Sequence, residues 1–169
     1  MIINRLHDFV HEGDISELAA PTGDFTLVTT KKTPVVLVSS GMGQTPLLSM
    51  LDYLTLTGSP RQVVWVHGSR NAQVHAFRKP VADLAAGYAN VQQHIFCDSL
   101  APGLGTANHY AGIVDLQQLN VGPLLPEADY YVCGPAPFIR KQVQDLAALG
   151  VPSEAIHFEE FGPATLNLS

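Results

Sequence analysis

The stretch VVLVSSGMGQTPLLSML, residues 35–51, joins an unbroken apolar run to a glycine-containing loop and then to leucines at helical spacing. A continuous apolar run is typical of a parallel strand that is buried on both faces. Gly41 and Gly43 permit a tight turn and a close approach of the backbone to a ligand. Thr45 is predicted to cap the following helix and Pro46 to occupy its first position. The stretch therefore predicts a strand, a candidate phosphate loop and a helix whose positive dipole end faces that loop.

This loop is an incomplete dinucleotide fingerprint, because Pro46 stands where the third glycine of the motif belongs. An ordinary strand-to-helix turn is the alternative interpretation. No lysine follows Gly43, which excludes the phosphate loop of nucleoside triphosphatases.

The same alternation of strands and helices continues along the chain. Strands are predicted at 35–39, 62–68, 90–97, 128–134 and 155–161, with helices at 45–58, 72–87, 113–121 and 135–150 and a long loop at 99–112. Pro80 should kink or restart the second helix. The pattern predicts an α/β fold with a doubly wound, Rossmann-like sheet of five parallel strands. Ligands bind such sheets at the carboxyl ends of the strands.

Residues 1–30 differ from the rest of the chain. They contain Gly-Asp and Pro-x-Gly turn signals between short alternating runs, which predict two short antiparallel strands. We therefore expect an N-terminal β segment at 1–30, a nucleotide-binding domain at 34–163 and a tail at 164–169.

Composition narrows the possible partners. The net charge is −6, and 46% of the 169 residues are hydrophobic. The absence of a basic run argues against nucleic acid and anionic membranes, and no apolar stretch approaches the ~18 residues that a membrane span needs. Cys97 and Cys133 match no metal-site spacing, so we expect no metal and a reducing, cytoplasmic location.

Candidate binding residues follow the second and fourth strands. His67, Gly68, Ser69 and Arg70 end the second strand, where Ser69 and Arg70 could bind a ribose phosphate or could belong to a solvated loop. The fourth strand ends in the residues 133–135, and its cysteine is either a small core residue or a group that faces the ligand.

Phe161 ends the last strand, close to the end of the chain. An aromatic ring at this edge could stack on a planar cofactor. The alternative is that Phe161 anchors the tail in the core.

Taken together, these segments resemble the ferredoxin-reductase superfamily, and within it the reductase part of flavohemoglobins. The resemblance is carried by APTGDF (20–25), SSGMGQTPLLSML (39–51), HG with VHAF (67–68 and 74–77), YVCGPAPFI (131–139) and IHFEEFGP (156–163). These segments occur in the order found in that family and span most of the chain.

The resemblance implies an NAD(P)H-binding domain of ferredoxin-reductase type that passes hydride to FAD. In flavohemoglobins, electrons then reach haem in a globin, where bound O₂ oxidises nitric oxide to nitrate. Phe161 would lie over the flavin ring. The pyrophosphate and ribose would lie against Gly41, Gly43, Gln44, Thr45 and Pro46, and the nicotinamide against Cys133, Gly134 and Pro135.

The chain also departs from that family. It contains no globin and little of the flavin-binding barrel, so we expect no haem here and read residues 1–30 as a remnant of the FAD-binding β-barrel. Ile3 stands where the family's phosphate turn has a serine, which leaves FAD binding doubtful. The exposed strand edges of the remnant could drive self-association or could dock a flavin- or globin-bearing partner.

Three functions remain open from the sequence: a reductase module, a nucleotide-binding module without redox turnover, and an interaction protein that dimerises through the remnant. The choice between NADH and NADPH is also open. Arg70 favours tolerance of the 2′-phosphate of NADPH, whereas flavohemoglobin-like modules use NADH.

Overall fold

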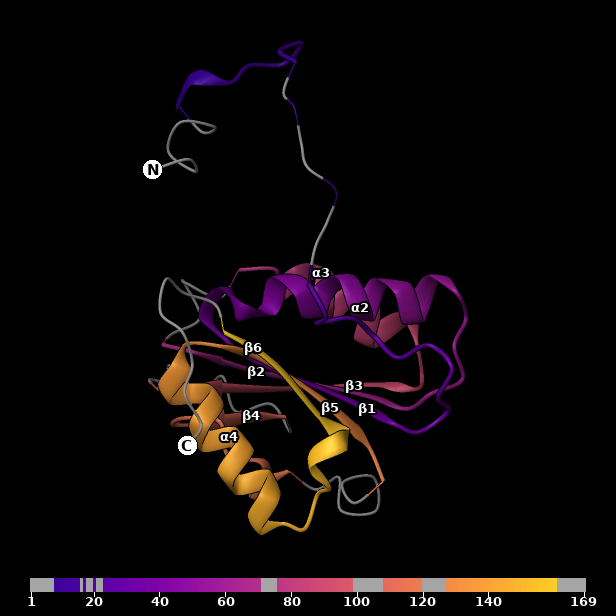
Figure 1. Ribbon diagram of the computed structural model, residues 1–169, viewed down its shortest axis with the longest axis vertical. Helices are drawn as coiled ribbons and strands as arrows, with labels where there is room; N and C mark the ends of the chain where they lie inside the picture. Colours follow the sequence, from indigo (N-terminus) through magenta and orange to yellow (C-terminus); the bar gives the residue numbers. More distant parts are fainter. Residues whose placement is uncertain are drawn as a thin grey trace.

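The protein is described by a computed structural model at residues 8–15, 17, 20, 23–70, 76–98, 108–119 and 127–160. Its centre is a six-stranded sheet in the order β4-β3-β2-β1-β5-β6, in which every neighbouring pair is parallel (Figure 1). The strands are β1 (Val35–Ser40), β2 (Val63–Ser69), β3 (Val91–Cys97), β4 (His109–Ala111), β5 (Asp129–Gly134) and β6 (Ile156–Glu160). The α/β class and the parallel sheet agree with the prediction.

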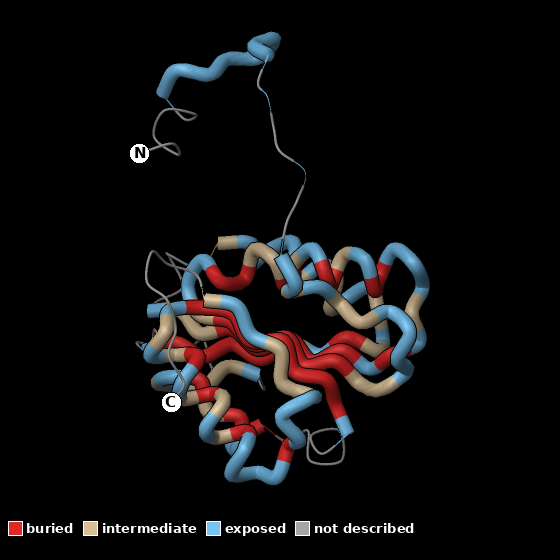
Figure 2. The backbone as a smooth tube through the Cα atoms, in the orientation of Figure 1, coloured by how far each residue is buried: buried red, intermediate tan, exposed pale blue. Residues whose placement is uncertain are grey.

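Helices cover both faces of the sheet (Figure 1). Helices α2 (Gln44–Leu56) and α3 (Arg78–Gly87) lie on one face, and α4 (Ala136–Ala148) lies on the other. Three short 3₁₀ turns complete the described part: η1 (Gly41–Gly43), η2 (Leu116–Gln118) and η3 (Ser153–Ala155). Each face carries its own apolar core, and the central strands run buried between them (Figure 2). The fold is therefore doubly wound.

The strand order fixes where a ligand can bind. From β1 the chain moves outward through β2, β3 and β4, whereas β5 lies on the other side of β1. The connections after β1 and β5 therefore leave the sheet in opposite directions. Such a switch point opens a crevice at the carboxyl ends of the two strands.

The predicted strand count of five was wrong by one. Strand β4 lies inside the stretch 99–112 that was expected to be a loop, and it pairs with the last residues of β3. Three residues are too few to show an alternating pattern, so this edge strand is defined by its pairing and not by its own sequence.

Two helix starts were partly mispredicted. Helix α2 begins at Gln44 with Gly43 as N-cap, so Thr45 is not the cap, and Pro46 is the third helical residue. Helix α3 begins at Arg78, which places Pro80 in its first turn. A proline is tolerated in the first turn of a helix, and residues 72–75 of the predicted helix lie outside the described residues.

The antiparallel strands expected within residues 1–30 are not seen among the residues of that segment that the structure describes. Residues 8–15 are exposed and lie apart from the sheet (Figure 2). Several other positions of the segment, Ile3 among them, lie outside the described residues, so the barrel remnant stays a prediction.

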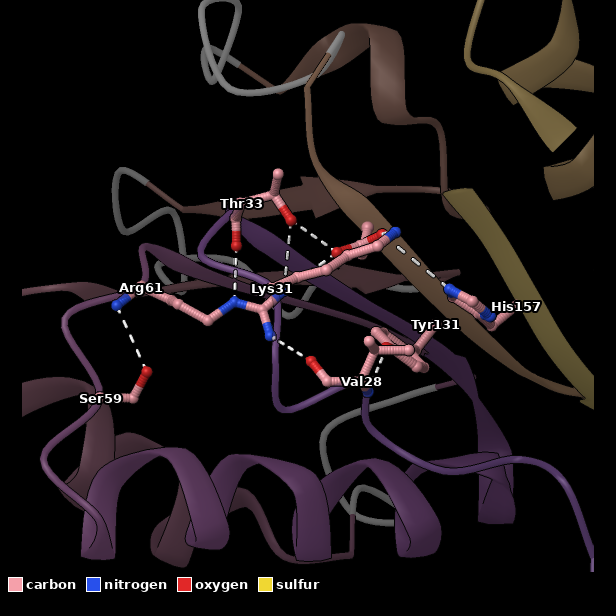
Figure 3. A network of polar contacts seen from close by, with 8 residues as sticks. Val28, Lys31, Thr33, Ser59, Arg61, Tyr131 and His157 are labelled. Carbon is pink, nitrogen blue, oxygen red and sulfur yellow. Dashed lines mark hydrogen bonds and ion pairs between the residues drawn. The ribbon is translucent and has the colours of Figure 1, made fainter. Parts of the chain in front are cut away.

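The segment before β1 is fixed to the sheet by a buried carboxylate. We call Lys31, Thr33, Arg61 and Asp129 the Asp129 clamp (Figure 3). The Asp129 carboxylate accepts hydrogen bonds from Lys31 Nζ at 2.6 Å, Thr33 Oγ1 at 2.6 Å and Arg61 Nη2 at 3.1 Å. Asp129 is only 2% exposed and Arg61 only 5%. The clamp joins the start of β5 to the loop before β2 and to the incoming chain.

Backbone groups of the incoming chain complete this arrangement. Arg61 donates to the carbonyl oxygens of Thr33 at 2.6 Å and Val28 at 3.0 Å. The Val28 N–H donates to Tyr131 Oη at 2.9 Å, and the Tyr131 ring stacks on His157 of β6 (Figure 3). The extended segment before β1 thus has its buried polar groups satisfied by β5 and by Arg61.

The clamp also determines the charge state of Asp129. Burial favours the neutral acid, but the hydrogen bonds from Lys31 and Thr33 and the charges of Lys31 and Arg61 outweigh it and hold the pKa of Asp129 below its usual value. A lowered pKa in the folded state stabilises the fold above the unfolded pKa of about 3.9. That stabilisation is lost as the pH falls through the folded-state pKa.

We predict that Asp129→Asn lowers the free energy of unfolding by about 3 kcal/mol, because it leaves Arg61 buried without its carboxylate. Urea denaturation at neutral pH measures this loss. The difference between wild type and variant should shrink as the pH is lowered below about 4, since protonation removes the same charge from the wild type.

Asp83→Asn is the matched control. Asp83 pairs with Lys79 on the exposed side of α3, and such surface pairs contribute well under about 1 kcal/mol. Equal destabilisation by both substitutions would contradict the role given to the clamp.

Candidate functional site

A cleft of about 520 Å³ runs along the carboxyl edge of the sheet. It crosses the ends of β1, β2, β3 and β5 and the residues after β4, as the switch-point rule predicts. Its lining residues are Ser40, Gly41, Met42, Gln44, Gly68, Ser69, Arg70, Asp98, Gly112, Ile113, Val114, Pro135 and Phe138.

The loop after β1 forms one end of this cleft. Gly41 has φ +58, which only glycine adopts without strain, and a Cβ built on it would meet open space. Thr45 Oγ1 donates to the Met42 carbonyl at 3.1 Å, which tightens the 3₁₀ turn before α2. Among the loop residues predicted to hold the nucleotide, Gly41 and Gln44 line the cleft, while Thr45 and Pro46 support it from the first turn of the helix.

Gly43 is required for a different reason than the one expected. A Cβ on this residue would lie 2.2 Å from the Cys133 carbonyl oxygen and 2.7 Å from the Gly134 nitrogen. Real Cβ atoms do not approach backbone so closely, because this distance lies inside van der Waals contact. Gly43 therefore lets the loop pack directly on the end of β5, and it is the neighbouring Gly41 that leaves room for a ligand.

Gln44 lines the cleft and carries a buried amide oxygen without a partner in the described part of the chain. It is 1% exposed, and its Oε1 has no hydrogen-bond partner among the described residues. A buried amide oxygen without a partner costs about 1–3 kcal/mol, and a donor from a bound ligand or water would offset that cost. Phosphate oxygens offer no hydrogen, whereas ribose hydroxyls do.

The end of β2 contributes three of its four predicted residues. Gly68, Ser69 and Arg70 line the cleft. His67 does not: it is 1% exposed, and its Nδ1 lies 2.9 Å from Ser39 Oγ beneath the cleft. Because side chains alternate along a strand, His67 points to the opposite face of the sheet from Gly68.

The end of β5 contributes chiefly through its backbone. Cys133 is 1% exposed and packs in the core beneath α2, and Gly134 is buried with Phe138 against it. Burial, with help from the Glu159 carboxylate, raises the pKa of the Cys133 thiol to about 12, so this group remains protonated and packs as an apolar residue. Pro135 lines the cleft, and Phe161 lies outside the described residues.

Several lining residues were missed from the sequence. Asp98 directly follows β3, so the rule that singled out the end of β2 would have found it. Met42, Ile113 and Phe138 carry no such signal, because apolar residues are common everywhere in the chain.

The described residues contain neither a metal-binding cluster nor a membrane-spanning helix. Within those ranges there is no group of three or more His, Cys, Asp or Glu residues that could hold a metal ion. No helix in the same part of the chain is long and apolar enough to cross a bilayer.

Comparison with known proteins identifies the fold and its relatives. A flavohemoprotein from Rhizobium meliloti is 43% identical over 96% of this chain. One from Halalkalibacterium halodurans is 37% identical over 97% of this chain. Each match covers 40% of the flavohemoprotein's own length. The flavohem-like FAD/NAD-binding domain of nitric oxide dioxygenase from Vibrio cholerae superposes with a TM-score of 0.83 at 32% identity, covering 95% of this chain and 64% of that one.

These relatives confirm the resemblance to the reductase part of flavohemoglobins, although the chain spans about 40% of the length of the curated flavohemoproteins it matches. The family model that matches is the oxidoreductase NAD-binding domain, over residues 37–144. That range contains most of β1, the cleft and most of α4. The chain belongs to the oxidoreductase NAD-binding domain family.

Proposed function

We propose that the chain binds NADH or NADPH in the carboxyl-edge cleft and serves as the nucleotide half of a flavohemoglobin-type reductase. The observation that carries this is the combination at the start of α2: an open glycine, a helix N-terminus and a buried amide oxygen without a partner. Together they offer donors for phosphate and an acceptor for a sugar hydroxyl.

Different residues of the cleft would bind different parts of the nucleotide. The N–H groups of the first turn of α2 would hold the pyrophosphate beside Gly41, where no side chain intervenes. Gln44 Oε1 would accept a hydrogen bond from a ribose hydroxyl. Pro135, at the N-terminus of α4, would border the nicotinamide side of the cleft. The protein thereby supplies binding and orientation, and the bound nicotinamide would supply hydride to a flavin.

Flavin and the later electron acceptors would come from a partner or from a longer form of the protein. The Vibrio cholerae relative is described as an FAD/NAD-binding domain, and the present chain covers 64% of it. We therefore propose that a flavin-bearing, and beyond it a globin-bearing, unit receives the electrons. Phe161 over the flavin ring stays a prediction, as does docking or self-association through residues 1–30. Cys97 and Cys133 are buried free thiols, which suits the proposed reducing cytoplasm.

The first prediction concerns nucleotide binding and turnover. Calorimetric titration should show saturable binding of NADH or NADPH to the chain, because the cleft is preformed. With FAD and NADH added together, bleaching of the flavin band should be slow, because free FAD must first meet the bound nicotinamide in the productive orientation. No heat change with either nucleotide at millimolar concentration would overturn the proposed function. Binding without any flavin reduction would indicate a nucleotide-binding module instead.

The second prediction concerns Gly43. Gly43→Ala should weaken NADH binding by at least about tenfold, because the new methyl displaces the loop from the end of β5. Gly58→Ala is the matched control: Gly58 has φ +62 and open surroundings at the other end of α2. It should cost about 1–2 kcal/mol of stability and leave the dissociation constant unchanged. Wild-type affinity in Gly43→Ala would refute the packing argument.

The third prediction concerns nucleotide preference. Arg70 and Asp98 both line the cleft at the neighbouring ends of β2 and β3, and the Asp98 N–H donates to the Ser69 carbonyl at 3.3 Å. A 2′-phosphate is attracted by the guanidinium and repelled by the carboxylate. Arg70→Ala should therefore weaken NADPH about tenfold and NADH much less, whereas Asp98→Asn should improve NADPH binding.

Titration of both nucleotides against both variants measures this preference. Equal losses for NADH and NADPH in Arg70→Ala would show that Arg70 does not contact the 2′-phosphate. An unchanged NADPH affinity in Asp98→Asn would show that the Asp98 carboxylate does not repel the 2′-phosphate.

A further inference from the structure

A second pocket lies at the amino edge of the sheet, at the opposite end of the strands from the proposed nucleotide cleft. Its volume is about 220 Å³, and we call it the amino-edge pocket. Its polar lining includes Thr29, Lys31 and Lys32 of the chain that leads into β1, and Tyr53, Ser59 and Arg61 of α2 and the loop after it. Pockets for drug-sized ligands measure about 300–1,000 Å³, so this one suits a smaller molecule.

The side chains around this pocket carry more positive than negative charge. Lys31, Lys32 and Arg61 line the pocket, and none of its lining residues is acidic. Within the Asp129 clamp one carboxylate faces two cations, Lys31 Nζ at 2.6 Å and Arg61 Nη2 at 3.1 Å, so one positive charge is left over. Lys32 adds another, because it makes no ion pair with any residue that the structure describes. In a chain whose net charge is −6, this edge is a local exception.

Arg61 gives the pocket a buried cation with an unused donor. It is only 5% exposed, and a guanidinium carries five N–H groups. Nε donates to the Thr33 carbonyl, Nη1 to the Val28 carbonyl, and Nη2 to Thr33 Oγ1 and to the Asp129 carboxylate (Figure 3). These contacts leave one N–H of Nη1 without an acceptor among the described residues. A buried charged donor of this kind gains most from an anionic acceptor beside it.

Further donors come from both of the chain segments that line the pocket. The Lys31 ammonium has three N–H groups and gives one to the clamp carboxylate, so two can turn to a ligand. Ser59 Oγ accepts a hydrogen bond from the Arg61 N–H at 3.4 Å and keeps its own hydrogen to donate. Thr29 and Tyr53 line the same pocket with hydroxyl-bearing side chains. Donors spread in this way suit a ligand that presents several acceptor oxygens.

The C-terminal end of α2 also lies at the pocket and works against an anion. A helix C-terminus carries about half a negative charge, which is less than the charge of Lys32 alone. The carbonyl oxygens of Tyr53, Leu54 and Thr55 already accept N–H groups from residues 57–59. The electrostatic balance at the pocket therefore stays positive.

We propose that the amino-edge pocket binds a small oxyanion, of the size and chemistry of inorganic phosphate, between Lys31, Lys32 and Arg61. The anion would supply the negative charge and the acceptor oxygens that these side chains leave unmatched. Because it would contact both the incoming chain and the loop before β2, it would tie the two together and reinforce the Asp129 clamp. The site is separate from the nucleotide cleft and does not depend on nucleotide binding.

Calorimetric titration and thermal unfolding with sodium phosphate test the site. Sodium chloride at matched ionic strength and pH is the reference, because it reproduces the screening of surface charges. Phosphate should bind saturably with a dissociation constant of about 1 mM. At about ten times that concentration, the unfolding temperature should lie about 3 °C above the chloride reference.

Lys32→Gln is the decisive variant, because it removes one cation of the pocket and leaves the clamp intact. It should unfold at the wild-type temperature in chloride and bind phosphate about tenfold more weakly. Lys79→Gln is the matched control: Lys79 is an exposed lysine of α3 that pairs with Asp83, and its loss should leave phosphate binding unchanged. Ser59→Ala removes a neutral donor and should weaken phosphate about threefold.

Glycerol phosphate, titrated in the same way, tells a free anion from the phosphate end of a larger molecule. Saturable binding of either one that Lys32→Gln weakens supports the oxyanion site, and the tighter of the two identifies the source.

Two outcomes would overturn the inference. Equal stabilisation of wild type, Lys32→Gln and Lys79→Gln by phosphate would show a general salt effect or binding elsewhere, such as at the start of α2. A titration of wild type without saturation up to about 50 mM phosphate would show that the pocket holds no oxyanion. Neither outcome bears on the proposed function, which is tested with NADH and NADPH at the other edge of the sheet.

Discussion

The architecture of the cleft depends on the contact between the loop after β1 and the end of β5. Gly43 brings the loop so close to the Cys133 carbonyl that no side chain fits between them. This contact fixes the first turn of α2 over the switch point of the sheet. Gly41 is then left with open space beside it, and Gln44 is left with a buried oxygen that no described residue satisfies. A site for a ligand results from tight packing at one glycine and open space at the other.

The opposite edge of the sheet is built on another principle. There the buried Asp129 carboxylate gathers Lys31, Thr33 and Arg61, and the incoming chain is tied to β5. Strong, satisfied charges at the amino edge hold the sheet and its connection in one arrangement, and removing one partner would leave another buried and uncompensated. The carboxyl edge, by contrast, has small residues and the unpartnered Gln44 Oε1 beside the cleft proposed for the nucleotide. The amino ends of the strands thus carry the stabilising clamp, and the carboxyl ends of the same sheet carry the proposed binding cleft.

Much of this could be predicted from the sequence because parallel strands and their helices have strong patterns. The apolar runs placed β1, β2, β3, β5 and β6, and the glycines after them marked the carboxyl edge. The direction of individual side chains was harder to predict. His67 and Cys133 stand at strand ends as expected, yet both point into the core beneath α2, because the alternation along a strand sends neighbouring residues to opposite faces.

Features that depend on distant partners were not predictable at all. Strand β4 is defined by its pairing with β3, and the role of Gly43 depends on its contact with the backbone of β5. Hydrogen–deuterium exchange with and without NADH tests the central claim most directly. The account predicts that NADH slows exchange at the amides of residues 41–44, 68–70 and 112–114 and leaves residues 28–33 unchanged. Protection centred on the Asp129 clamp, or none along the carboxyl edge, would contradict it.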